Sequence, residues 1–183
     1  KNQQVLDYRN SIYGNIVVAK EKEQYTFFYN GTPVVIAPYP DEQFVEDFGN
    51  LPMLFHPEPK EALIIGGGAG GLINKLLKHS LTSLDYAELD PLIIKMLKEY
   101  QTPLVSSELN DSRVRVSNTD GRFFLRDSAG TYDIIFIGIS KPSDLSTNRF
   151  FTREFFQLAR MRLKQRGILS LWLPGSFSYL SDE

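Results

Sequence analysis

Short apolar runs separated by turn residues fill the first part of the chain and predict β structure. Three such runs occupy residues 16–18, 25–29 and 33–36. The second and third are joined by Asn30-Gly31, and both residues tolerate the positive φ that a type I′ hairpin turn requires. We therefore predict a small antiparallel sheet over residues 1–40, whose edges need cover from the next domain or from a partner chain.

A helical pattern begins after residue 41. Asp41 is a favourable N-cap, and apolar residues recur behind it at helical spacing: Phe44, Phe48 and Leu51. Prolines then indicate a linker, and they are Pro52, Pro57 and Pro59. We predict a helix and linker over residues 41–60.

Strands and helices alternate from residue 61 onward. Apolar runs predict strands at residues 62–65, 84–89, 113–116, 134–137 and 168–173. Helices are predicted after the glycine run, after Asp90-Pro91 and after Thr152, with Gly167 just past the end of the last one. This alternation is typical of a parallel, doubly wound α/β sheet, which we predict for residues 61–183.

The composition excludes several kinds of site. The chain has 183 residues, a net charge of −2 and no cysteine. This charge gives no electrostatic basis for binding nucleic acid or an anionic membrane surface. Without cysteine there are no disulfides, thiolate metal sites or cysteine nucleophiles. The two histidines are His56 and His79, so we predict no bound metal.

The chain also gives expectations about location. No apolar run approaches the roughly 18 residues that a membrane-spanning helix needs, so we predict that this chain does not cross a membrane. The absence of cysteine fits a reducing, cytoplasmic compartment. The chain starts at Lys1 without a methionine and stops at Glu183, and we expect it to be a piece of a larger protein.

Candidate binding residues stand at the ends of three successive predicted strands. The first strand runs into the glycine-rich turn 66–71, whose backbone N–H groups can approach a ligand closely. Glu88 ends the second strand, where a carboxylate can accept hydrogen bonds from both hydroxyls of a ribose. Asp120 follows the third strand, where a carboxylate could accept a hydrogen bond from the amino group of an adenine. Together they predict a nucleoside pocket formed by Gly66, Gly67, Gly68, Gly70, Gly71, Glu88, Asp120 and Gly121.

Each of these features also has an ordinary structural explanation. A glycine run can be a tight strand–helix turn, and Glu88 can be a solvated acid at a strand end. Asp120-Gly121 can be a simple turn. Their occurrence in order, one at each strand end, favours the nucleoside pocket.

The same residues carry a resemblance to a known family. The chain resembles the spermidine synthases over nearly its whole length, and it is most similar to the branch fused to membrane helices. The resemblance rests on Ile64-Ile65-Gly66-Gly67-Gly68-Ala69-Gly70-Gly71, Ala87-Glu88-Leu89-Asp90, Asp120-Gly121, Tyr132-Asp133-Ile134-Ile135 and Phe151-Thr152-Arg153-Glu154-Phe155-Phe156. It implies an S-adenosylmethionine-dependent methyltransferase-like Rossmann fold behind a small N-terminal sheet, and a parent protein anchored in a membrane.

The resemblance also implies ligands. In this family decarboxylated S-adenosylmethionine donates an aminopropyl group to putrescine and leaves methylthioadenosine. By resemblance, residues 66–71 face the aminopropyl or methionine-like part of the donor, Glu88 holds its ribose and Asp120 its adenine. The implied partners are an adenosyl co-substrate, decarboxylated or not, and an amine acceptor, with no tightly bound cofactor.

Two expectations about assembly follow from the resemblance. A homodimer through the N-terminal sheet is one of them. The other concerns the sheet of this fold, which normally closes with a hairpin after its fifth strand. Because only residues 174–183 remain, we expect a shortened sheet with an exposed edge on that side.

The acidic residues that the family uses in catalysis are replaced. The family has an Asp after the fourth strand and another directly before a proline, and here these are Gly138 and Lys141. The first Asp helps to deprotonate the acceptor amine, which is otherwise protonated at neutral pH because its pKa is about 10. Lys141 adds a positive charge where a cationic amine would bind. Asp144 is the weak candidate for a replacement base.

Other family positions have changed as well. The acid of the glycine loop is Ala69, and the tyrosine and glutamine of the gate helix are replaced by Val45 and Glu46. The glutamine after Tyr13 is Gly14. The adenosine half of the pocket is thus kept, and the diamine half is not.

Four functions stay open at this point. The chain can be an aminopropyltransferase or a close transferase, or a catalytically degenerate binding or assembly module of a larger membrane-anchored protein. An S-adenosylmethionine-dependent methyltransferase shares the donor fold. A dinucleotide-dependent oxidoreductase also fits the glycine spacing.

Overall fold

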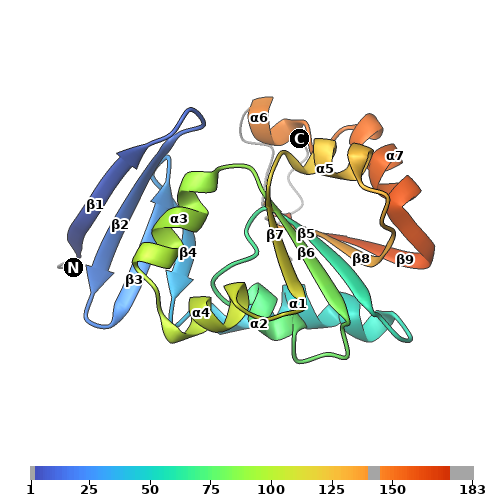
Figure 1. Ribbon diagram of the computed structural model, residues 1–183, viewed down its shortest axis with the longest axis horizontal. Coiled ribbons are helices and arrows are strands. Elements are labelled where there is room, and N and C mark those ends of the chain that lie inside the picture. The colour runs from blue at the N-terminus through green and yellow to red at the C-terminus, as the bar shows by residue number, and fades with distance from the viewer. Residues whose placement is uncertain (1–2, 140–144, 174–183) are drawn as a thin grey trace, which may run out of the picture.

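Two sheets stand side by side in the computed structural model, which describes residues 3–139 and 145–173. Figure 1 shows the N-terminal sheet at the left and the larger sheet, with its helices, at the right. The smaller sheet has the order β1-β2-β3-β4, and the larger has the order β7-β6-β5-β8-β9. The predicted antiparallel sheet followed by a parallel α/β sheet is confirmed.

The N-terminal sheet is an antiparallel meander. Its strands are β1 (Gln4–Asn10), β2 (Asn15–Glu21), β3 (Gln24–Tyr29) and β4 (Thr32–Ala37). Asn30 and Gly31 have φ of 48° and 79° and join β3 to β4. Both angles are positive, as the central residues of a type I′ turn require.

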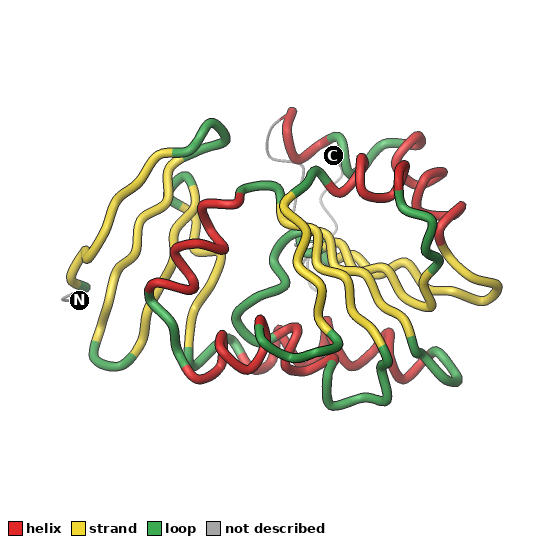
Figure 2. The backbone as a smooth tube through the Cα atoms, viewed as in Figure 1, coloured by secondary structure: helices red, strands yellow, loops and turns green. Residues whose placement is uncertain are grey.

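The larger sheet is parallel in every pair. Its strands are β5 (Glu61–Ile65), β6 (Ser83–Glu88), β7 (Val114–Asn118), β8 (Tyr132–Ile137) and β9 (Leu163–Leu171). Figure 2 shows these strands converging toward the middle of the molecule. Because the strands are parallel, their carboxyl ends lie at one edge of the sheet. β5 is central and pairs with both β6 and β8, so the order of strands reverses beside it. In such sheets the ligand crevice lies at this switch point.

Helices cover both faces of the larger sheet. They are α1 (Glu42–Phe55), α2 (Leu72–Leu76), α3 (Pro91–Glu99), α4 (Pro103–Leu109), α5 (Gly121–Asp127), α6 (Leu145–Asn148) and α7 (Arg153–Arg162). The predicted caps Asp41, Asp90 and Thr152 accept hydrogen bonds from the first turns of α1, α3 and α7. The sequence did not predict α4, α5 and α6. Thr102 and Asp120 are the N-caps of α4 and α5.

Alternate residues of the central strands build two separate cores. Ala62 and Ile64 of β5 face a core that includes the N-terminal sheet and α1 to α4. Leu63 and Ile65 face a second core with α5 and α7. Because both faces are buried, the strands read as continuous apolar runs rather than as alternating patterns.

Three details of the sequence prediction are wrong. Pro52 lies inside α1 instead of opening the linker, and α1 continues to Phe55. Leu51 was expected to face inward with Phe48, but 52% of it is exposed. Gly167 lies within β9 and not just past α7, because the strand begins directly after the helix and its register with β8 shifts between Tyr132 and Ile134.

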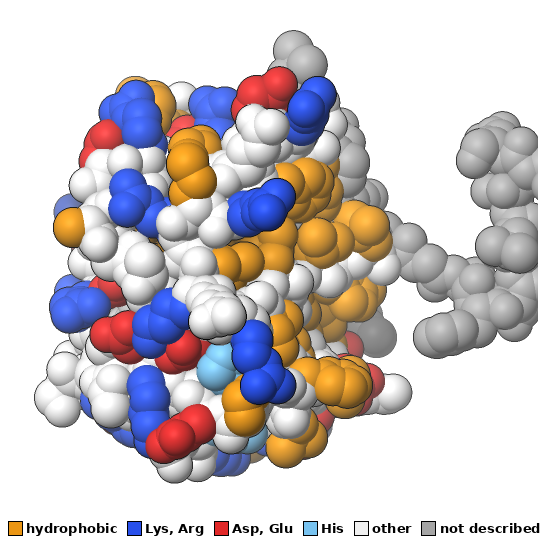
Figure 3. Space-filling model, turned by 90° about the vertical axis from the view of Figure 1, so that its right-hand side faces the viewer, with side chains coloured by type: hydrophobic (Ala, Val, Ile, Leu, Met, Phe, Trp, Pro, Cys, Tyr) orange, Lys and Arg blue, Asp and Glu red, His pale blue; other side chains and the backbone are white. Residues whose placement is uncertain are grey.

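β9 forms one edge of the larger sheet and pairs with β8 in the described part of the chain. Apolar side chains gather on the face of the molecule shown in Figure 3. Near β9, the rings of Trp172 and Phe44 lie 5.5 Å apart, and 41% of Trp172 is exposed. Residues 174–183, where a closing hairpin was expected to be missing, lie outside the described residues. In the described ranges, no helix is both long and apolar enough to cross a membrane.

Candidate functional site

Backbone hydrogen bonds bring the ends of the central strands together. The Gly66 N–H donates to the Ala87 carbonyl at 2.9 Å, and the Thr119 N–H donates to the Glu88 carbonyl at 2.9 Å. On the other side of β5, the Gly138 N–H donates to the Ile65 carbonyl at 3.0 Å. The glycine turn, Glu88 and the segment before Asp120 therefore lie along one edge of the sheet, as the sequence predicted.

The glycine turn is tightly packed on its outer side. Gly66, Gly67, Gly70 and Gly71 all have positive φ, which side chains disfavour. A Cβ on Gly68 would lie 2.9 Å from the Tyr86 ring, and a Cβ on Gly70 would lie 2.6 Å from Val35 of β4. The glycines thus let the turn approach both β6 and the N-terminal sheet.

A buried carboxylate that the sequence did not single out holds the second half of this turn. Glu108 of α4 is fully buried. One oxygen accepts the Gly70 N–H at 2.7 Å, and the other accepts the N–H groups of Gly71 at 2.7 Å and Asn74 at 3.1 Å. Glu108 lies 37 residues from Gly71 in the chain, so no local sequence pattern indicated that the two would be in contact.

Glu88 has unfilled acceptor capacity. Its Oε2 accepts the Tyr86 hydroxyl at 2.6 Å, whereas its Oε1 has a long 3.5 Å contact with the Asp90 N–H. Burial raises the pKa of Glu88 above its ordinary value, although the hydrogen bond from Tyr86 opposes this. The backbone N–H groups of Asp90 and Leu89 also act on this half-buried carboxylate, but among the hydrogen bonds of the described residues no donor lies closer than 3.5 Å to Oε1, so this oxygen can still accept hydrogen bonds from ribose hydroxyls.

Two residues of the N-terminal hairpins lie beside Asp90, close to Glu88. The Ser11 hydroxyl donates to Asp90, which is buried and caps α3. Burial, with Asp90 and Glu88 nearby, raises the pKa of Tyr29 on β3. The N-terminal hairpins therefore lie against the segment that carries Glu88 and Asp90.

Asp120 is engaged by two arginines. One of its oxygens accepts the Arg122 N–H at 2.9 Å as the cap of α5, and the other lies 2.9 Å from Arg149 Nη1. The carboxylate is buried, and the Nε groups of Arg122 and Arg149 are buried without an acceptor among the described residues. An adenine amino group at Asp120 would therefore share the carboxylate with Arg149.

Gly121 packs against β5. A Cβ at this position would lie closer than 3.0 Å to the Ile65 side chain. Asp120-Gly121, for which a simple turn was the ordinary structural explanation, is thus the start of a helix that approaches the sheet closely.

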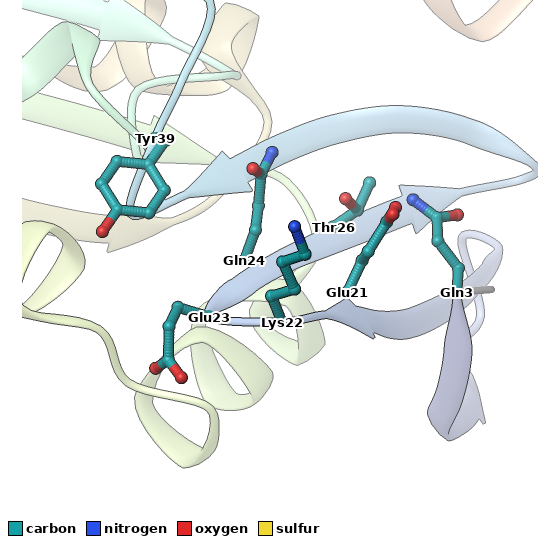
Figure 4. Close-up of a pocket in the computed structure, with 7 residues that line it drawn as sticks. All are labelled: Gln3, Glu21, Lys22, Glu23, Gln24, Thr26 and Tyr39. Atoms are coloured by element: carbon teal, nitrogen blue, oxygen red, sulfur yellow. The ribbon is translucent and has the colours of Figure 1, made fainter. Parts of the chain in front are cut away.

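Two hollows in the described part of the chain lie away from these strand ends. One, of about 450 Å³, lies at the β2–β3 turn and is lined by Gln3, Glu21, Lys22, Glu23, Gln24, Thr26 and Tyr39. Figure 4 shows these side chains around it. The other, of about 190 Å³, lies between α5 and α7 and includes Arg122 and Thr152 in its lining. Within residues 3–139 and 145–173, no three His, Asp or Glu side chains gather as metal ligands.

Comparisons with known proteins decide the family. The model of the spermine/spermidine synthase domain matches residues 42–173, which is more than half of the chain. The chain belongs to the spermine/spermidine synthase family. A polyamine aminopropyltransferase of Lachnospira eligens is 38% identical over 135 residues, which cover 73% of this chain and 46% of that protein.

Other members of the family agree. The spermidine synthase of Schizosaccharomyces pombe is 29% identical over 93% of this chain and 53% of its own length. The crystal structure of spermidine synthase from Thermotoga maritima superposes with a TM-score of 0.77 and 27% identity, over 91% of this chain and 55% of that one. A spermidine synthase in complex with the transition-state analogue AdoDATO gives a TM-score of 0.78 at 28% identity, over 87% of this chain and 55% of that one. The chain thus spans about half the length of these synthases.

Gly138, where the resemblance places the first family acid, has no room for a side chain. A Cβ at Gly138 would lie closer than 3.0 Å to the carbonyl oxygen of Gly66. Conversely, the Ile139 side chain lies 3.2 Å from where a Cβ on Gly66 would be. The end of β8 thus packs closely against the glycine turn, at the place where the resemblance puts an acidic side chain in the family.

The other replaced positions have structural partners or lie outside the described residues. Val45 packs 3.1 Å from where a Cβ on Gly71 would be. Glu46 pairs with Lys75 of α2 and accepts a hydrogen bond from Asn50. Ala69 is buried. Lys141 and Asp144 lie outside the described residues, so the expectations about them stay predictions.

Proposed function

We propose that this synthase-family chain binds an adenosyl ligand with its ribose on Glu88 and its 5′ group over the glycine turn. The observation that carries the proposal is the Glu88 carboxylate, whose Oε1 lacks a close donor at the switch point of the sheet. Methylthioadenosine, decarboxylated S-adenosylmethionine and S-adenosylmethionine all offer the ribose hydroxyls that it would accept. We propose Gly66, Gly67, Gly68, Gly70, Gly71, Asp120 and Gly121 as the rest of the pocket.

Binding without aminopropyl transfer is the function that this geometry supports best. Transfer to an amine requires that the attacking nitrogen first lose a proton. Gly138 offers no acid, and the carbonyl of Gly66 fills the space beside it. Asp144 stays the candidate for a replacement base.

Aminopropyl transfer is the second candidate, and family membership favours it. The relatives are named as aminopropyltransferases and spermidine synthases, and one solved synthase holds the analogue AdoDATO. These names support a decarboxylated donor and an amine acceptor for the whole protein. They give no support to a methyltransferase or a dinucleotide-dependent oxidoreductase.

Methylthioadenosine is expected to bind the protein with a Kd of roughly 10 μM, measured by titration calorimetry. With decarboxylated S-adenosylmethionine and a panel of amines, release of methylthioadenosine is expected to stay at background. The Thermotoga maritima synthase serves as the positive control. Absence of binding would reject the proposal, and clear turnover would replace it with the second candidate.

Removing Arg149 is expected to strengthen methylthioadenosine binding by about fivefold. Arg149→Met removes the partner of one oxygen of the buried Asp120. The adenine amino group would then donate a hydrogen bond to this oxygen, which would otherwise be buried without a donor. Calorimetry measures the change. Arg153→Met, which removes a positive charge from an exposed position of α7, is the control. Weaker binding in Arg149→Met would show that the arginine contacts the ligand instead.

The remaining expectations are proposals about the whole protein. We propose the three-part organisation 1–40, 41–60 and 61–183, a homodimer through the N-terminal sheet, and a cytoplasmic location of this chain in a membrane-anchored parent. Light scattering of the purified chain tests the dimer. Fractionation of cells that express the full parent protein tests the anchoring.

A further inference from the structure

We propose that Glu108 is a specificity-determining residue that makes the glycine turn reject adenosyl ligands with a negative group on the 5′ side. The inference rests on the proposed function, because it concerns the 5′ end of the same ligand. The ligands that the site would accept are adenosyl compounds whose 5′ substituent is neutral or cationic.

The geometry at the turn carries this inference. The Glu108 carboxylate is fully buried and accepts three backbone N–H groups, those of Gly70, Gly71 and Asn74. In this class of fold, the ribose lies at the end of the second strand and the group on its 5′ carbon lies over the first strand–helix turn. The N–H groups of that turn ordinarily serve anionic groups. Here a carboxylate of the protein already holds them.

Two physical effects then oppose a second anion. The N–H groups of Gly70, Gly71 and Asn74 have no free donor to offer, so a ligand carboxylate would lose its water without gaining those hydrogen bonds. The buried charge of Glu108 would also repel it, and burial weakens the screening of that repulsion. A neutral thioether or an ammonium group meets neither obstacle.

No cation of the surrounding elements neutralises Glu108 directly. The charged or titratable side chains on the elements packed against α4 are Lys75 of α2 with Lys78 and His79 just beyond it, Lys95, Lys98 and Glu99 of α3, and Arg115 of β7. Among the described residues, no hydrogen bond or ion pair joins any of them to Glu108. Lys75, Glu99 and Arg115 pair with Glu46, Arg9 and Asp85.

Three ligands isolate the effect of one carboxylate. Methylthioadenosine has a neutral 5′ group, S-adenosylhomocysteine carries an ammonium and a carboxylate, and decarboxylated S-adenosylhomocysteine carries the ammonium alone. Calorimetry on the protein is expected to show at least about tenfold tighter binding of the decarboxylated compound than of S-adenosylhomocysteine. In Glu108→Gln this ratio is expected to fall at least about fivefold, because the amide keeps the shape and loses the charge. Glu58→Gln, on an exposed side chain, should keep the ratio of the unmodified protein.

The unmodified protein gives a second readout that does not depend on the variant's folding. Burial raises the pKa of Glu108, against the opposing effect of its three N–H donors. As the pH falls through this raised pKa, Glu108 becomes neutral, so the ratio should shrink in the unmodified protein. Glu88 titrates as well, but it contacts the ribose that all three ligands share, so its effect cancels in the ratio. In Glu108→Gln the ratio should not change with pH.

The outcomes separate the two proposals. If none of the three ligands binds, the proposed function fails. If methylthioadenosine binds but the two homocysteine compounds bind equally, the role of Glu108 is overturned. An equal loss of affinity for all three ligands in Glu108→Gln, with the ratio unchanged, would also overturn it and leave Glu108 a purely structural residue.

Discussion

Glu88→Gln is expected to weaken methylthioadenosine binding about 100-fold. The carboxylate would accept both ribose hydroxyls in charge-assisted hydrogen bonds, each worth about 1.5–3 kcal/mol. The amide keeps one oxygen for the Tyr86 hydroxyl but turns an N–H₂ group toward the ligand. A loss of about 3 kcal/mol corresponds to that change in Kd. Titration calorimetry at neutral pH measures it.

The same variant is expected to fold at least as stably as the unmodified protein. The pKa of Glu88 is raised by burial, so the folded state prefers the protonated carboxyl. Its contribution to stability is therefore present below the pKa that Glu88 has in the unfolded chain, about 4.3, and is lost as the pH rises through the pKa of the folded state. At neutral pH the neutral amide removes this cost. Urea denaturation that shows a large loss of stability would mean that Glu88 is a structural acid.

Gly138→Asp is expected to destabilise the fold by about 3 kcal/mol or more without creating aminopropyl transfer. The φ of Gly138 is not in the left-handed region, so an L-residue meets no backbone strain there. The obstacle is space, because the new Cβ would meet the carbonyl oxygen of Gly66 at less than 3.0 Å. Rigid backbone on both sides cannot yield as a flexible side chain would, and overpacking of this kind costs about 1–3 kcal/mol or more. Chemical denaturation measures the change.

Two alanine variants separate the causes. Gly138→Ala adds the Cβ without the charge and should show most of the same loss. Gly31→Ala is the matched control, because Gly31 has a φ of 79° but nothing within 4 Å of its added Cβ. Its cost should stay at about 1 kcal/mol. The opposite outcome is that Gly138→Asp folds normally and releases methylthioadenosine with an amine acceptor. The chain would then lack only the acid, and the close packing of β8 on the glycine turn would not prevent aminopropyl transfer.

The site has two halves. The Glu88 variant tests whether the pocket binds the adenosyl ligand, and the Gly138 variant tests whether the missing acid alone prevents aminopropyl transfer. A protein that passes both tests binds the adenosyl part of a synthase ligand and leaves the amine unreacted.

Much of the fold could be predicted from the sequence because it depends on local pattern. The run at residues 62–65 predicted β5, and the Asn30-Gly31 turn predicted the hairpin between β3 and β4. Asp90-Pro91 predicted the start of α3. In each case a few neighbouring residues carry the signal, since strand period, turn φ and helix caps all act over short distances.

The errors come from elements whose signal is weak or overridden. The short helices α4, α5 and α6 have too few residues for a helical period to stand out, and Asp120-Gly121 was considered as a pocket residue pair or a simple turn rather than as the start of a helix. Pro52 stayed inside α1 because that stretch is buried against α2 and the sheet. Gly167 became part of β9 because pairing with β8 sets the end of α7.

The sequence by itself determined the succession of the five parallel strands and the place of Glu88 and the glycine turn at one edge of the sheet, because these follow from local pattern and parallel topology. Its motifs carried the resemblance to the family. Only the tertiary structure decided how the turn's N–H groups are used. It brought Glu108 to Gly70 and Gly71, placed Arg149 on Asp120, and closed Gly138 on Gly66. Each of these contacts joins residues far apart in the chain, and packing in three dimensions leaves no trace in the spacing of residues along it.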